Sequence, residues 1–340
     1  MTNLDDRTAP EPGWVARAVD RLRGWPYGPV RVVNVVRIGA EHGLSGTVYR
    51  VTVDCADRQR RTFVLKQDGA PGIERALAFH AAMGDRLIGS VPACYGGEID
   101  DSGGIGFLFL EDIAPAVQGD VLVDPGDEAA GAAMRTIARV HATSWRSSGA
   151  DHPASLLRWH AEAWAPDRWS ERLTGARTRY PEILTAEVSR SLKRLPDQVD
   201  DAITELRAGP ASWIHGDAHL DNIVWRADGS AVLLDWAGAV IGPPAVDAAR
   251  FLVEGPTGLA ADPERRMRLI GAYSRELTER GVPSSDVAAI PTSVGQAMLP
   301  LVQGIVGWAG RPEEEPIGRR MAALRENALR SVVGWLSRTS

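Results

Sequence analysis

Residues 213–225 read WIHGDAHLDNIVW, a stretch in which two histidines, two aspartates and an asparagine stand between apolar runs. The apolar flanks favour burial, so the polar centre has to be held by other polar groups. The chain continues as NIVWRADGSAVLLDW to residue 236, where two apolar runs flank Asp228 and Gly229. Asp-Gly is a preferred pair for a two-residue hairpin turn, so these residues predict a hairpin directly after the polar stretch.

The turn predicts which residues of the hairpin face each other. With Asp228 and Gly229 at the turn, counting outward pairs Asn222 with Asp235. An amide oxygen beside a carboxylate suits Mg²⁺, which takes a few hard oxygen ligands and keeps phosphate oxygens and water as the others. Asp217, in the preceding loop, can reach the same space. A carboxylate there can orient a hydroxyl nucleophile and accept its proton.

At this point the chain resembles a known family. HGDAHLDN (215–222) is similar to the H-G-D-x-H-x-x-N loop of the aminoglycoside phosphotransferase and choline kinase group, relatives of the protein kinases, and LLDW (233–236) is similar to the metal-binding segment that follows it. The resemblance covers residues from about 30 to 255. It implies these roles: catalytic base, Asp217; Mg²⁺ ligands, Asn222 and Asp235; loop-bracing residues, His215, His219 and Asp247.

Elements before the motif agree with the small lobe of such a kinase. Strand patterns at 30–36, 47–53, 62–67, 93–99 and 106–112 surround one helical stretch at 73–84, and helical spacing starts at residue 127. The resemblance implies an α+β, bilobal protein-kinase-like fold, with a small antiparallel-sheet N-lobe and a larger, mainly helical C-lobe. The expected divisions are an N-lobe at 1–112 with an N-terminal extension at 1–28, a hinge at 113–126, and a C-lobe at 127–340 with its catalytic loop at 213–236 and four helical segments after the hairpin.

The N-lobe carries the residues expected to bind a nucleotide. Only two of the 38 basic residues are lysine, and one of them, Lys66, ends an apolar strand, where it is expected to reach nucleotide phosphates. Glycine-turn backbone groups would hold phosphate oxygens, Glu74 would pair with Lys66, and the hinge backbone would bind a purine. The expected residues are Gly43, Ser45 and Gly46 in the turn and Glu111, Asp112 and Ile113 in the hinge.

Composition limits the class of protein. The chain has 340 residues, a net charge of −6 and an acidic excess in its middle, which argues against a nucleic-acid partner. Cys55 and Cys94 form no metal or disulfide pattern. The N-terminal stretch lacks the features of a signal peptide, and the apolar run at 298–308 is interrupted and too short to span a bilayer. We expect a cytoplasmic protein without membrane contact, present as a monomer or homodimer.

The resemblance implies an enzyme that moves the γ-phosphate of ATP or GTP, with Mg²⁺, to a hydroxyl of a small molecule. The preferred acceptor is an antibiotic or related hydroxylated natural product, such as an aminoglycoside or nucleoside antibiotic, and the reaction would confer resistance or self-protection. Residues 148–209 and the C-terminal helices are expected to bind it, with stacking possible at Trp159, Trp164, Trp169 and Trp308. A metabolic kinase for a sugar, amino sugar, nucleoside or choline is the alternative.

Two other classes remain open from the sequence. A nucleotide-binding pseudokinase would keep the fold without transfer. A metal-dependent hydrolase would use the alternating His215, Asp217 and His219 as ligands, although such sites usually recruit more histidines.

Overall fold

The computed structural model describes residues 9–39, 46–100, 104–146, 159, 166–311 and 318–337. Gly43, Ser45 and Trp164 lie outside these residues. The chain divides into two compact units, one made of Met1–Val117 and Leu234–Ala239, the other of Gln118–Leu233 and Val240–Ser340. The short segment 234–239, which contains Asp235, therefore belongs to the first unit although it follows a hairpin of the second.

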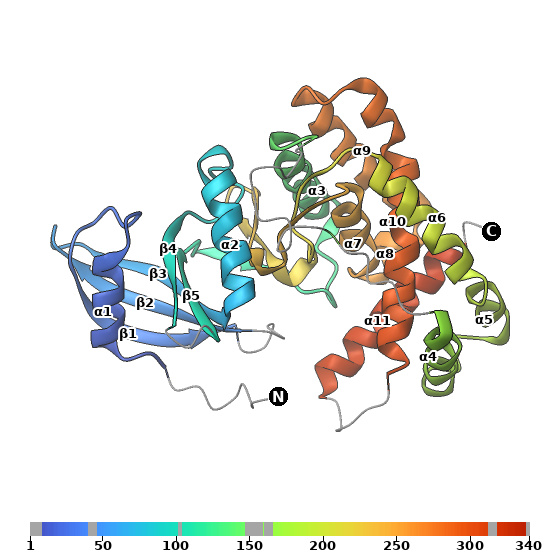
Figure 1. The fold of residues 1–340 in the computed structure, drawn as a ribbon, viewed down its shortest axis with the longest axis horizontal. Coiled ribbons are helices and arrows are strands. Elements are labelled where there is room, and N and C mark those ends of the chain that lie inside the picture. The colour runs from blue at the N-terminus through green and yellow to red at the C-terminus, as the bar shows by residue number, and fades with distance from the viewer. Residues whose placement is uncertain are drawn as a thin grey trace. The chain divides into compact units, whose positions relative to one another are not determined.

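The first unit is built on one antiparallel sheet with strand order β1-β2-β3-β5-β4, coloured blue to teal in Figure 1. Alternating burial along β2 matches a strand that has two different faces. The strands of this sheet are β1 (Val30–Ile38), β2 (Thr47–Cys55), β3 (Arg60–Gly69), β4 (Cys94–Ile99) and β5 (Ile105–Glu111). Short β6 (Ala116–Gln118) follows at the boundary of the unit, and the 3₁₀ turn η2 (Gly84–Arg86) follows the long helix α2 (Ala70–Met83).

The two faces of the sheet are covered differently. Helix α1 (Pro12–Arg21) buries its apolar side against one face, in a cluster that contains Phe63 and Leu65 of β3 and Trp25. Lys66, one residue further on, points to the opposite face, where it lines a pocket together with Ile73 of α2. Residues 1–28 were expected to be an extension; within them, α1 and Trp25 are part of the core of this unit.

The second unit is mainly helical, and the expected α+β fold class is confirmed. Its long helix α10 packs against five others, α4, α6, α7, α9 and α11. Its described elements are α3 (Gly126–Thr143), α4 (Pro166–Arg179), α5 (Ala186–Leu192), α6 (Leu195–Ala208), β7 (Ser212–Ile214), η3 (Leu220–Asn222), β8 (Ile223–Arg226), β9 (Ala231–Leu233), β10 (Val240–Gly242), α7 (Ala245–Val253), α8 (Thr257–Ala261), α9 (Pro263–Glu279), α10 (Ser284–Ala309) and α11 (Arg319–Leu336).

The region after the hairpin holds five helices among the described residues, where the sequence predicted four. The additional element is the short α8, which Pro256 precedes and Pro263 follows. Helix α10 contains the apolar run at 298–308 and, with 26 residues and a mean hydropathy of 1.2, has the length and composition of a membrane span. Half of the most apolar 18-residue segment of α10 is buried. The helix packs against five others, as a core helix of a folded protein does.

The hairpin has a different register from the predicted one. Ile223 pairs with Leu233 and Trp225 with Ala231, because the turn contains three residues rather than two. Gly229 has φ of +80° and donates its N–H to the Arg226 carbonyl at 2.9 Å, which closes a β-turn followed by a left-handed glycine. Asp235 is therefore not the register partner of Asn222, and its own φ of 55° places it outside the strand.

We predict that Ala227→Pro preserves or raises stability. Proline suits the second position of the observed turn, and the preceding Arg226 is extended, so the change should raise the unfolding free energy by up to about 1 kcal/mol. In the two-residue turn, the Ala227 N–H would be needed for pairing and proline would destabilise the hairpin. Urea unfolding followed by circular dichroism measures the difference. Gly229→Ala is the matched control and should cost about 1–2 kcal/mol, because alanine disfavours positive φ.

Candidate functional site

One buried carboxylate binds the backbone of the loop between β7 and η3. Asp247, in the first turn of α7, accepts the backbone N–H groups of His215 at 2.6 Å and Gly216 at 2.9 Å. The His215 ring is fully buried, and its Nδ1 accepts the N–H of Asp217 at 3.2 Å. Gly216 has φ of +77°, a conformation that most other residues disfavour. The backbone on both sides of Gly216 is thus fixed where Asp217 begins.

Asp247 is charged although it lies in the interior. His141 of α3 places Nε2 at 3.1 Å from the Asp247 carboxylate, while its Nδ1 is 2.7 Å from the Tyr273 hydroxyl of α9. Burial by itself would raise the pKa of Asp247, but the His141 hydrogen bond and the nearby histidines outweigh it and lower that pKa. His141 is therefore a fully bonded histidine of the interior, and the chain of contacts ties three helices to the loop.

Asp217 is a residue of this loop that reaches solvent. Its carboxylate is 48% exposed, with Oδ2 at 3.3 Å from His219 Nε2 and Oδ1 at 3.2 Å from Arg250 Nη1. Desolvation would raise the pKa of Asp217, but the hydrogen bond and charge of His219, with the charge of Arg250, lower it well below its ordinary value. The same pairing raises the pKa of His219 against the effect of its burial. Asp217 is therefore ionised at neutral pH.

Asn222 closes the loop onto Asp217. Its Nδ2 donates to the Asp217 carbonyl at 2.9 Å and approaches the Asp217 carboxylate at 3.3 Å. Because the amide nitrogen is directed at Asp217, the amide oxygen is the atom of Asn222 that remains for a ligand. An amide oxygen is a hard donor of the kind that Mg²⁺ accepts. The loop thus supplies one carboxylate and one amide oxygen within a five-residue span.

Arg250 and Glu254 were not singled out in the sequence. Arg250 Nη1 contacts Asp217 and also lies 2.8 Å from the Glu254 carboxylate, one helical turn further on. A signal was present in the segment AVDAAR, because Arg250 follows Asp247 by three residues and side chains at that spacing lie on the same side of a helix. Helix α7 therefore presents both the residue that holds the loop and the cation that contacts its carboxylate.

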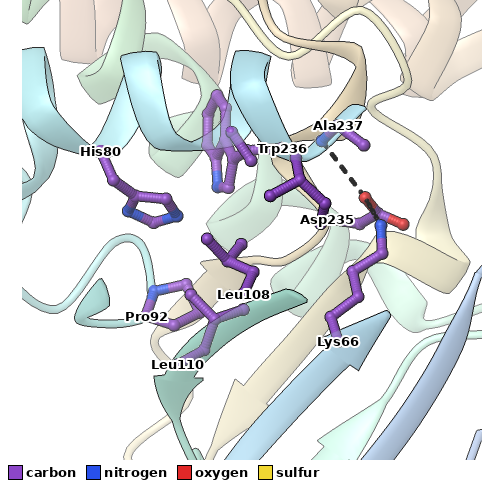
Figure 2. A pocket seen from close by; sticks show the side chains of 10 residues that line it. Lys66, His80, Pro92, Leu108, Leu110, Asp235, Trp236 and Ala237 are labelled. Atoms are coloured by element: carbon purple, nitrogen blue, oxygen red, sulfur yellow. Dashed lines mark hydrogen bonds and ion pairs between the residues drawn. The ribbon is translucent and has the colours of Figure 1, made fainter. Parts of the chain in front are cut away.

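In the first unit, Lys66 is buried between two carboxylates. Its side chain is 6% exposed, and its Nζ lies 3.1 Å from Asp68. The same nitrogen lies 2.5 Å from Asp235 (Figure 2). Burial would lower the pKa of Lys66, but the charges of Asp235 and Asp68 outweigh it and raise the pKa. Asp235 has left-handed backbone and also accepts the Ala237 N–H at 3.3 Å. Lys66 and Asp235, predicted as separate parts of a site, are in direct contact.

Glu74 was expected to pair with Lys66, and the structure does not bring them together. Glu74 is exposed on α2, after its first turn, while its neighbour Ile73 and the later Ala76 face the pocket that Lys66 lines. A helix advances about 100° per residue, so a side chain next to a buried position points away from it. The partners of Lys66 among the described residues are Asp68 and Asp235 instead.

The other predicted nucleotide contacts are partly described. Gly46 has φ of +75°, and a Cβ there would lie 2.8 Å from the Gln67 carbonyl, so both conformation and space require glycine. In the expected hinge, the Glu111 N–H already donates to the Ala93 carbonyl, and the Asp112 carboxylate is bound by Arg50 at 2.8 Å. No hydrogen bond of the Ile113 backbone appears among those of the described residues.

The pocket beside Lys66 is mostly apolar (Figure 2). It lies between α2, β5 and the segment 235–237, and one wall is Trp236, which stacks on Phe79 with ring centroids 3.6 Å apart. His80 also lines it, and neither ring nitrogen has a hydrogen-bond partner among the residues that the structure describes. Burial lowers the pKa of His80 to about 4, so the ring is neutral at physiological pH. The stack fixes the residue that follows Asp235.

The described residues hold no group of three or more His, Cys, Asp or Glu that could bind a metal ion, which is the arrangement that a metal-dependent hydrolase requires. The three described tryptophans proposed for stacking have protein partners: Trp169 is buried and donates to the Leu192 carbonyl at 3.1 Å, and arginine lies over the rings of Trp159 and Trp308. These contacts are those of packing within the second unit.

Comparison with known proteins identifies the fold and the family. The profile of the phosphotransferase enzyme family matches residues 37–283. Three solved structures are similar over most of both chains. An aminoglycoside phosphotransferase from Alicyclobacillus acidocaldarius has a TM-score of 0.55 at 13% identity, covering 98% of this chain and 97% of that one.

The second is amicoumacin kinase hAmiN with AMP-PNP, Ca²⁺ and Ami, with a TM-score of 0.53 at 14% identity over 88% of this chain and 90% of that one. The third is spectinomycin phosphotransferase APH(9)-Ia with ADP and spectinomycin, with a TM-score of 0.53 at 12% identity over 98% and 100%. A search of curated proteins found no match to this chain. At these identities the structures show a shared fold. Because the family profile spans most of its length, the chain belongs to the phosphotransferase enzyme family and acts on a hydroxyl acceptor.

Proposed function

We propose that the protein transfers the γ-phosphate of ATP or GTP to a hydroxyl of an antibiotic or a related hydroxylated natural product. The observation that carries this proposal is the loop 215–222, which holds an ionised, half-exposed Asp217 beside the amide of Asn222. A carboxylate fixed in this way can direct a hydroxyl group, and its neighbour offers an oxygen to a cation.

Asp217 is proposed to orient the acceptor hydroxyl and take its proton. The hydroxyl oxygen forms a bond to the γ-phosphorus, the bond from that phosphorus to the β-γ bridging oxygen breaks, and the nucleoside diphosphate leaves. Phosphoryl transfer passes through a loose transition state, so correct placement of the hydroxyl matters more than a strong base. A low pKa for Asp217 suits this role, because the residue stays ionised and able to accept the hydrogen bond.

The nucleotide side of the reaction is assigned to the first unit. Lys66 is proposed to bind phosphate oxygens, as a compact ammonium does, with the backbone near Gly46 as a further contact. Asn222 and Asp235 are the proposed Mg²⁺ ligands; their donor atoms, an amide oxygen and a carboxylate, fit that ion. Bound Mg²⁺ would neutralise charge on the phosphates. Asp235 would then exchange its contact with Lys66 for one with the ion.

The acceptor class is proposed from the similar structures and from the charge of this chain. Spectinomycin and Ami are the small molecules present in two of the similar structures. The acidic excess of residues 101–250 agrees with a cationic acceptor, and Glu254 places one acid next to Arg250 near Asp217. We therefore propose an antibiotic acceptor, resistance or self-protection as the role, and the cytoplasm as the location, where nucleotide is available.

The first experiment is a search for the acceptor. The protein is incubated with Mg²⁺ and ATP or GTP and a panel of aminoglycosides, nucleoside antibiotics, macrolides, amino sugars and choline, and products are examined by mass spectrometry. We expect a gain of one phosphoryl group on an antibiotic, and its loss by at least about 10²-fold in Asp217→Asn, the lower range for a positioned proton acceptor.

Each result of this experiment decides between functions. Phosphorylation of choline or an amino sugar alone would replace the antibiotic proposal with a metabolic kinase. Nucleotide binding without transfer to any acceptor would favour the pseudokinase. Absence of nucleotide binding would contradict the proposed reaction itself.

A second prediction concerns the pH dependence of the rate. Removing the Arg250 charge, as in Arg250→Gln, should raise the pKa of Asp217 towards its ordinary value and leave Glu254 unneutralised nearby. Because the ionised form of Asp217 is required, the acidic limb of kcat/KM should move to higher pH. Arg330→Gln, which removes an exposed arginine paired with Glu326 on α11, is the control and should leave the limb in place. An unchanged acidic limb in both variants would contradict the assigned contact.

A third prediction concerns the metal. Asn222→Ala removes an uncharged oxygen donor and should raise the Mg²⁺ concentration for half-maximal rate by at least about tenfold, the lower bound for disturbing a metal site. The requirement is measured at saturating nucleotide. If the variant lost rate without any change in Mg²⁺ requirement, Asn222 would act only by holding Asp217.

A further inference from the structure

Asp68 is a partly buried acid that was not predicted from the sequence as a site residue. Its side chain is 17% exposed, and its Oδ2 lies 3.1 Å from Lys66 Nζ. Lys66 and Asp68 are separated by one residue on β3, and side chains two apart in a strand point to the same face of a sheet. The pair is therefore set by the geometry of a single strand.

The Asp68 carboxylate is held in one orientation. Its Oδ1 accepts the N–H of Gly69 at 2.7 Å, which leaves Oδ2 for the lysine. Glycines stand on both sides of it: a Cβ at Gly46 would lie 3.3 Å from Asp68 Oδ2, and a Cβ at Gly72 would lie 3.7 Å from the same atom. A Cβ at Gly46 would be a tight contact for the carboxylate, whereas one at Gly72 would be in ordinary van der Waals contact with it.

Asp235, the other carboxylate in contact with Lys66, is also proposed to bind Mg²⁺. A carboxylate that binds a cation offers less to a neighbouring ammonium. Helix α2 supplies no replacement, because Glu74 is exposed and the residues that face the pocket are Ile73, Ala76 and His80. When nucleotide and metal are present, Asp68 is the protein carboxylate that remains on Lys66 among the described residues.

We propose that Asp68 is the residue that positions Lys66 for the nucleotide phosphates, in place of a glutamate from α2. This inference rests on the proposed function, in which Lys66 binds phosphate. Asp68 acts through the lysine and does not itself touch the nucleotide. It fixes the ammonium at the end of a flexible side chain and offsets its charge in a buried position, where an unpaired cation would be costly.

The test compares Asp68→Asn with Glu74→Gln. Both replace one acid by its amide, and asparagine retains an oxygen for the Gly69 N–H. We measure the Kd of ATP and GTP with Mg²⁺ by isothermal titration calorimetry. Loss of a charged hydrogen bond that positions Lys66 should weaken binding about 10- to 100-fold in Asp68→Asn. Glu74→Gln should stay within about twofold, the scale of surface changes.

The sign of the effect is decisive. If Asp68 were only a negative charge near the site, its removal would tighten binding of the anionic nucleotide. Unchanged or tighter binding in Asp68→Asn, or equal weakening in Glu74→Gln, would overturn the proposal. Failure of the unmodified protein to bind either nucleotide is a different result, because it contradicts the proposed function and not the contact between Asp68 and Lys66.

A second measurement needs no nucleotide. The chain has only two lysines, so isotope labelling of lysine alone gives one Cε signal for Lys66 and one for Lys193, and Lys193→Arg assigns them. We expect the pKa of Lys66 to fall in Asp68→Asn, since burial is then opposed by one carboxylate fewer, and to stay constant in Glu74→Gln. The Lys193 signal is the internal control in each titration. An unaltered Lys66 titration in Asp68→Asn would show that the two side chains do not interact in solution.

Discussion

A cation buried in a protein interior must be paired, and the ammonium of Lys66 imposes that requirement on the first unit. Strand β3 buries Lys66 on the face of the sheet opposite to α1, so two carboxylates and the segment 234–239 are organised around one nitrogen atom. The left-handed backbone of Asp235 and the stacking of Trp236 on Phe79 place the second carboxylate there. Removing the lysine would leave the carboxylates of Asp68 and Asp235 close together without a cation between them.

In the second unit the buried charge that must be paired is an anion. Asp247 is a buried anion, and the groups that satisfy it are backbone amides of the loop together with His141. A loop whose amides are bound in this way loses conformational freedom before any ligand arrives, which lowers the entropic cost of binding. The half-exposed Asp217 thereby acquires a defined position from a residue thirty positions later in the chain.

The sequence predicted the parts of this structure that depend on local pattern. The α+β fold class and the family followed from the resemblance carried by the motif at 215–222, whose residues have a fixed spacing, and the strand and helix patterns agreed with it. The predictions were wrong where a difference of one residue, in the length of a turn or in position along a helix, changes which side chains meet. A three-residue turn instead of a two-residue turn shifted the hairpin register, and one step around α2 separates exposed Glu74 from buried Ile73. The contact of Arg250 with Asp217 depends on how α7 packs against the loop, so it was not foreseen. The contact of Asp68 with Lys66 is local to β3 and follows from a spacing of two residues, but it was overlooked.

The placement of Lys66 and Asp68 on one strand has a consequence for control of the protein. When the partner of a phosphate-binding lysine lies on a separate helix, displacement of the helix can disconnect the pair and silence the protein. Here the two side chains are separated by a single residue of β3, and the sheet holds that strand between β2 and β5. Movement of α2 cannot take Asp68 away from Lys66. Displacement of α2 is therefore not a means of breaking this pair, in contrast to a pair formed between a strand and a helix.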